Sequence, residues 1–147
     1  MISSMLRVYG KKFDVLRFLK DSGWKVKKHW LKGEKRNSKL LNKDFGFNFE
    51  ILYSNRYSID GYKKHIEEIV RFLKKNENNI KKIWKLGAEK IWVDIGIIDD
   101  TKFSISPCFK GEILKIAYKQ KLLLGVSFYP SKFRVKSNSQ IVLNKSA

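Results

Sequence analysis

The chain has 147 residues and a formal net charge of +18, and its length is typical of a single domain. Its content of 43% hydrophobic and 14% aromatic residues excludes an intrinsically disordered protein. Its uninterrupted apolar runs reach only three or four residues, so we expect no segment that spans a membrane. The first residues lack the basic and apolar regions of a signal peptide, and the single cysteine, Cys108, fits a reducing compartment. We therefore expect a cytoplasmic protein.

Two periodicities follow one another along the chain. They predict, in order, a strand, a helix, two strands, a helix, a strand, a helix and a strand. Apolar side chains at every second position mark the strands, and apolar side chains three or four positions apart mark the helices. The predicted strands are 5–9, 24–31, 45–54, 91–98 and 122–129, and the predicted helices are 13–22, 58–87 and 111–120.

The stretch 58–87 is the longest predicted element and the one that can cover a whole sheet. Ser58 is suited to cap its start and Gly87 to end it. At 1.5 Å per residue the stretch is about 40 Å long, so we expect a bend near residues 76–79.

The strand 45–54 has the clearest alternation in the chain, and its apolar face is predicted to lie buried under the long helix. That face carries Phe45, Phe47, Phe49, Ile51 and Tyr53, and the helix residues expected to meet it are Ile66, Ile69 and Leu73. In the preceding strand, Trp24 and Trp30 are predicted to share one face.

All three helices can lie on one side of a single sheet. This arrangement predicts an α+β two-layer sandwich of ferredoxin-like type, with a mainly antiparallel sheet. We expect one domain over residues 5–130, followed by a basic tail or an added edge strand over residues 131–147. The other sheet face is then open, and exposed aromatic side chains on it would form a binding surface. The side chains predicted on the open face are Arg7, Tyr9, Glu50, Leu52, Trp92, Asp94, Leu123 and Tyr129.

The turn after the second strand has a distinct composition. We expect Trp30 to pack inward against the sheet edge or the first helix, with Lys32 and Glu34 in solvent. Gly33 between them is expected to adopt a positive backbone φ.

Several of these segments resemble a bacterial family called domain of unknown function 4279. The resemblance rests on the first strand ending in Gly10, the turn Trp30-Leu31-Lys32-Gly33-Glu34, the long helix, and the strands at Trp92-Val93-Asp94 and Leu124–Tyr129. It covers residues 5–130 and implies an immunity-type protein that neutralises a cognate polymorphic toxin, with no active site to carry over. Because nucleases present basic clefts, the high positive charge implies a toxin with an acidic or neutral surface.

Side chains for metal-dependent or covalent catalysis are sparse. The only histidines, His29 and His65, do not form a ligand pair at helical spacing, and Cys108 has no histidine nearby in the sequence. We therefore expect no enzyme, no cofactor and no bound metal.

The alternative function is RNA or DNA binding through the basic surface. Residues 11–43 contain twelve basic and three acidic side chains, a field that attracts polyanions or an acidic protein. Residues 43–50 partly match the third-strand signature of RNA-recognition domains, which requires Phe45 and Phe47 to be exposed for base stacking. Lysines outnumber arginines 26 to six, which favours nonspecific attraction over base recognition.

We therefore predict a non-enzymatic bacterial interaction protein, either an immunity-type partner of a toxin or a nucleic-acid-binding module. The sequence leaves its oligomeric state open between monomer and dimer. The candidate partner-binding residues are Arg7, Tyr9, Trp30, Lys32, Trp92, Asp94 and Tyr129.

Overall fold

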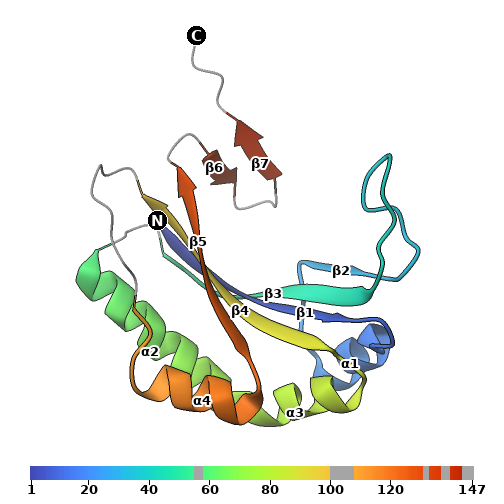
Figure 1. Cartoon of the computed structure of the whole chain (residues 1–147), viewed down its shortest axis with the longest axis horizontal. Helices are drawn as coiled ribbons and strands as arrows, with labels where there is room; N and C mark the ends of the chain where they lie inside the picture. The colour runs from blue at the N-terminus through green and yellow to red at the C-terminus, as the bar shows by residue number, and fades with distance from the viewer. Residues whose placement is uncertain (55–57, 100–107, 131–132, 137–139, 144–147) are drawn as a thin grey trace.

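A computed structural model describes residues 1–54, 58–99, 108–130, 133–136 and 140–143. Over this part of the chain, a five-stranded mixed sheet is covered by four helices, which confirms the predicted α+β class (Figure 1). The elements are β1 (Ile2–Gly10), α1 (Val15–Ser22), β2 (Lys28–Trp30), β3 (Phe45–Ser54), α2 (Ile59–Lys75), α3 (Glu77–Lys85), β4 (Lys90–Asp99), α4 (Glu112–Gln120), β5 (Leu123–Pro130), β6 (Phe133–Lys136) and β7 (Gln140–Leu143).

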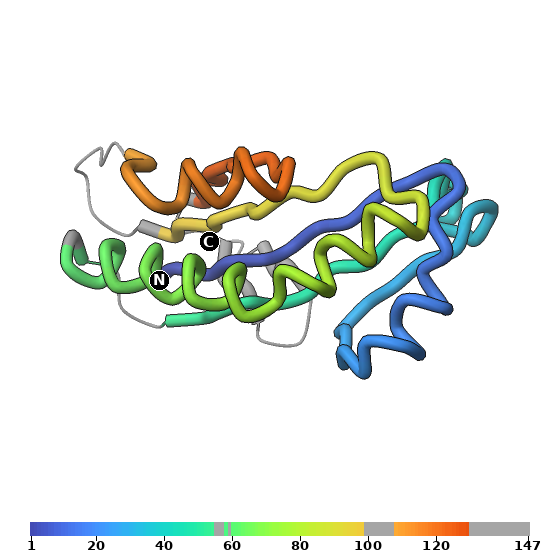
Figure 2. Tube along the Cα trace, turned by 90° about the horizontal axis from the view of Figure 1, so that it is seen from below, coloured from blue at the N-terminus to red at the C-terminus, as the bar shows by residue number. Residues whose placement is uncertain are grey.

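The strand order in the main sheet is β2-β3-β1-β4-β5, so β2 and β5 form its edges. Neighbouring strands are antiparallel except β4 and β5, which run parallel and are connected through α4. The helices all lie on one face of the sheet, with α2 and α3 running along its length (Figure 2). β6 and β7 pair with each other in a separate two-stranded sheet.

The predicted long helix is present and bends where expected. It divides at Asn76 into α2 and α3, and the Asn76 side chain donates a hydrogen bond of 2.9 Å to the carbonyl of Phe72. The Ser58 hydroxyl accepts a hydrogen bond of 2.9 Å from the N–H of Gly61 and so caps the start. Gly87 follows the last turn with a φ of 96°, a conformation that favours glycine.

The core lies between the helices and the inner face of the sheet. The inner face of β4 is fully buried, and α2 and α3 place buried isoleucines and leucine against the sheet. Phe47 on β3 is 0% exposed, as predicted, while Phe49 is half-buried. The Phe47 ring stacks on Phe18 of α1 at a centroid distance of 5.3 Å, and Phe49 stacks on Phe72 of α2 at 5.5 Å. Phe45 and Ile51, also predicted to be buried, are half-buried and pack against the core as Phe49 does.

A bulge in β3 overturns part of the predicted face assignment. Ser4 of β1 pairs with Leu52, whereas the next residue, Met5, pairs with Glu50, so Ile51 is the extra residue. Beyond the bulge the alternation reverses. Leu52 therefore lines a hollow against α2 instead of the open face, and Tyr53 is exposed instead of buried.

The predicted common face of Trp24 and Trp30 is also wrong. β2 spans only three residues, and the segment between Gly23 and Lys28 is not a strand, so alternation does not connect the two rings. Trp24 packs into the core, with its ring 4.5 Å from that of Phe49, whereas Trp30 lies on the other side of the sheet.

Candidate functional site

The sheet face that the helices leave uncovered, called the open face below, has a buried ionic network at its centre. Asp94 on β4 is only 5% exposed and accepts hydrogen bonds from Arg7 on β1, at 3.0 Å from Nε and 2.6 Å from Nη2. Its other oxygen accepts a hydrogen bond of 2.8 Å from the hydroxyl of Ser127 on β5. Burial lowers the pKa of Arg7, but attraction and hydrogen bonding to Asp94 outweigh it, so the pKa is raised and the guanidinium stays charged. The network links β1, β4 and β5, and both carboxylate oxygens of Asp94 accept hydrogen bonds within it.

Three aromatic rings on the open face rest on glycines of neighbouring strands. Trp30 covers Gly46, Trp92 covers Gly125, and the Tyr129 ring lies over Gly96. A methyl group on Gly46 or Gly125 would overlap the indole above it. The absence of a side chain at these glycines therefore leaves room for the rings to lie close against the sheet.

Gly125→Ala is expected to lower the free energy of unfolding by about 1–3 kcal/mol, because the added methyl must displace the Trp92 indole. Urea denaturation measures the change. The same substitution in a Trp92→Ala background should cost less than about 1 kcal/mol, because the obstructing ring is gone. An equal cost in both backgrounds would show that the ring is not the cause.

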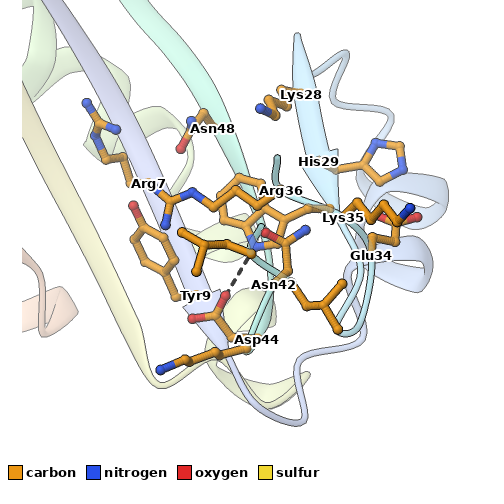
Figure 3. Close-up of a pocket in the computed structure, with 14 residues that line it drawn as sticks. Arg7, Tyr9, Lys28, His29, Glu34, Lys35, Arg36, Asn42, Asp44 and Asn48 are labelled. Carbon is orange, nitrogen blue, oxygen red and sulfur yellow. Dashed lines mark hydrogen bonds between the residues drawn. The ribbon is translucent and has the colours of Figure 1, made fainter. Parts of the chain in front are cut away.

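A hollow of about 600 Å³ lies at one end of the open face, called the loop hollow below. Its floor comes from β1, β2 and β3, and its wall comes from the loop of residues 31–44 (Figure 3). Trp30 is fixed there, since its Nε1 donates a hydrogen bond of 3.1 Å to Asp44 and its ring centroid lies 5.6 Å from that of Tyr9. Trp30 thus packs on the sheet and not on α1.

The loop of residues 31–44 folds back on itself as a hairpin. The N–H of Gly33 donates to the carbonyl of Asn42 at 2.9 Å, and the N–H of Asn42 donates to the carbonyl of Glu34 at 2.8 Å. Gly33 has a φ of 87°, which confirms the predicted positive angle. Lys32 and Glu34 are exposed, as expected, and the Glu34 carboxylate accepts a hydrogen bond from the N–H of Leu31.

The loop hollow carries more positive than negative charge. Five of its residues are cationic and two are acidic; the cations are Arg7, Lys28, Lys35, Arg36 and Lys43, and the acids are Glu34 and Asp44. Arg7 is paired with Asp94, but no carboxylate within the described ranges forms an ion pair with the other four. Figure 3 shows the Arg36 side chain reaching across the hollow toward Tyr9 and Arg7. The hollow is therefore suited to an anionic group.

The predicted site residues divide into three groups. Arg7, Tyr9 and Trp30 meet at the loop hollow, whereas Trp92, Asp94 and Tyr129 lie farther along the open face. Lys32 is exposed in the turn and does not line the hollow. Sequence reasoning missed Lys28, Arg36 and Asn48. Because Lys28 lies two residues before Trp30 in the same strand, alternation could have placed both side chains on one face. No local pattern places Arg36 against the sheet.

Other functional features are limited. Within the described ranges, no three His, Cys, Asp or Glu side chains gather as metal ligands. Cys108 is exposed, and His65 is buried within α2. None of the helices described combines the length and apolar character needed to cross a bilayer. The RNA-recognition signature does not place stacking rings on the open face, because Phe47 is in the core.

Comparison of the chain with protein-family models, with curated proteins and with solved structures finds no match.

Proposed function

We propose that this chain is a non-enzymatic interaction protein whose open face binds an acidic surface of a partner protein, as an immunity protein binds its cognate toxin. The observation that carries the proposal is the group of unpaired cations next to exposed apolar side chains. Leu40 and Leu41 are exposed beside the loop hollow, and Trp92 and Leu123 are exposed as neighbours on β4 and β5. Tryptophan, tyrosine and arginine are enriched in protein interfaces, and exposed apolar side chains beside them are typical of a surface that binds a protein.

The family and fold assignments are part of the same proposal. The one-sided helices and the order β2-β3-β1-β4 support a ferredoxin-like core extended by β5. The segments quoted above support membership of the domain of unknown function 4279 family. Both assignments fit a single domain over residues 5–130 without an active site.

The test is to look for a toxin encoded next to this gene, to co-express its toxin domain with the chain, and to measure binding of the purified pair by calorimetry. We expect the chain to restore growth and Trp92→Ala to lose about 2 kcal/mol of binding free energy, roughly 30-fold in Kd. The matched control is Tyr118→Ala, which removes a ring that is 89% exposed on α4 and should leave the affinity unchanged. Failure to restore growth, or an unaltered affinity after Trp92→Ala, would contradict the proposal.

A single-stranded RNA titration separates the alternative function. Short oligonucleotides should bind weakly, without sequence preference, and with an affinity that falls steeply between low and physiological salt, because counterion release supplies it. Removing residues 132–147, which carry four basic side chains, should reduce the salt slope. Tight, salt-resistant binding that prefers one sequence would replace the protein partner with a nucleic acid.

A further inference from the structure

The loop hollow has the size and enclosure of a small-molecule site. Its volume of about 600 Å³ falls within the roughly 300–1,000 Å³ typical of ligand pockets. The sheet forms its floor, and a hydrogen-bonded hairpin loop forms its wall. The hollow adjoins the Trp92 region of the proposed docking surface, since Arg7 on its floor pairs with Trp92 in the sheet.

The charged groups in the hollow point to an oxyanion. The Arg36 side chain reaches across the hollow toward Tyr9 and Arg7 (Figure 3). Asp94 neutralises Arg7, whereas Arg36 has no ion-pair partner in the part of the chain described. Guanidinium groups bind phosphate and carboxylate through paired, charge-assisted hydrogen bonds. Lys28 and Lys35 add positive charge along the same hollow.

The aromatic side chains of the hollow point to a planar group beside the oxyanion. Tyr9 and Trp30 bring two rings together in the hollow, where a base can stack. Asn48 also lines the hollow, where its amide can hydrogen-bond to the edge of a base.

From these contacts we propose that the loop hollow binds a nucleoside phosphate. The phosphates lie against Arg36 and the lysines, the base stacks on the ring pair, and the base edge meets the Asn48 amide. An acidic peptide would satisfy the cations but would leave the ring pair without a stacking partner. A longer nucleic-acid strand would have to cross Arg7 and Asp94, whose charges already neutralise each other.

The experiment titrates ATP, GTP, CTP and UTP, in parallel with tripolyphosphate and adenosine, into the full-length chain by calorimetry at physiological salt. At least one nucleotide should bind about tenfold more tightly than tripolyphosphate, because the base adds stacking to charge. Tryptophan fluorescence should change on binding, and Trp30→Phe should abolish that change. Arg36→Ala should weaken nucleotide binding by about tenfold or more. Arg36 is exposed in the loop, so its removal leaves the core intact.

The matched control is Lys115→Ala, which removes an exposed cation from α4 and should alter the affinity by less than about twofold. Equal affinities for tripolyphosphate and the nucleotides would show that the base contributes nothing and that charge alone accounts for binding, which would overturn the proposal. So would the absence of saturable binding by all four nucleotides, or an unchanged affinity after Arg36→Ala. A ten-residue oligothymidylate that binds more than about tenfold tighter than every nucleotide would assign the hollow to a polymer instead. None of these outcomes depends on the toxin test.

Discussion

Phe47→Ala is expected to lower the free energy of unfolding by about 3–5 kcal/mol, the range for truncating a fully buried phenylalanine. The ring is 0% exposed and contacts three aromatic side chains that precede β2 in the sequence, Phe13, Phe18 and Trp24. It stacks on Phe18 of α1, and its edge meets Trp24 at a centroid distance of 6.3 Å. Its removal leaves a cavity that the surrounding rings are too rigid to fill.

Urea or thermal denaturation of purified protein measures this effect. The matched control is Phe128→Ala on β5, where the ring is 55% exposed and its loss should cost less than about 1 kcal/mol. Similar small costs at both positions would mean that Phe47 is not in the core. Such a result would restore the RNA-recognition interpretation of the 43–50 segment.

Acidification from neutral pH toward pH 4 is expected to destabilise the protein through His65. This side chain is 2% exposed, and neither ring nitrogen has a hydrogen-bond partner among the residues the structure describes. Burial lowers the pKa of His65 from its ordinary value of 6.5 to about 4. The unfolded chain therefore takes up a proton at a higher pH than the folded chain. Stability is complete above about pH 6.5 and is lost as the pH falls toward 4.

The expected loss from His65 is about 2 kcal/mol at pH 5 and approaches about 3 kcal/mol near pH 4. Denaturation midpoints of the wild type and His65→Leu, compared between pH 7.5 and 4.5, isolate this contribution from that of the carboxylates. The free energy of unfolding of His65→Leu, relative to that of the wild type, should rise as the pH falls. His29→Leu, which replaces an exposed histidine, should follow the wild type. Parallel curves for His65→Leu and the wild type would refute the expectation.

The features that were predictable from the sequence are those fixed by local interactions. The caps at Ser58 and Gly87 and the break at Asn76 depend on residues within a few positions of one another. Local patterns therefore located the long helix and its bend. The burial of Phe47 followed from alternation within one strand.

The errors arose where a distant segment decides the outcome. The bulge at Ile51 is defined by pairing with β1, about 50 residues away, and alternation within β3 does not reveal it. The alternation of residues 24–31 suggested a strand, but the core aromatic cluster holds Trp24 on the opposite side of the sheet from Trp30. The loop hollow depends on the loop folding back over β3, so Arg36 could not be assigned to it from spacing.

The two edges of the main sheet differ in ways that affect the behaviour of the protein in solution. β2 is three residues long and carries Lys28 and His29, and a short, charged edge discourages pairing with another sheet. β5 is eight residues long and has no charged side chain, and its outer edge pairs with no other described strand. Such an edge can pair with a strand of another copy. Repulsion between copies, each with a net charge of +18, opposes this edge-to-edge aggregation at β5. Salt shortens the range of that repulsion, so concentrated stocks should be most stable against precipitation at low ionic strength.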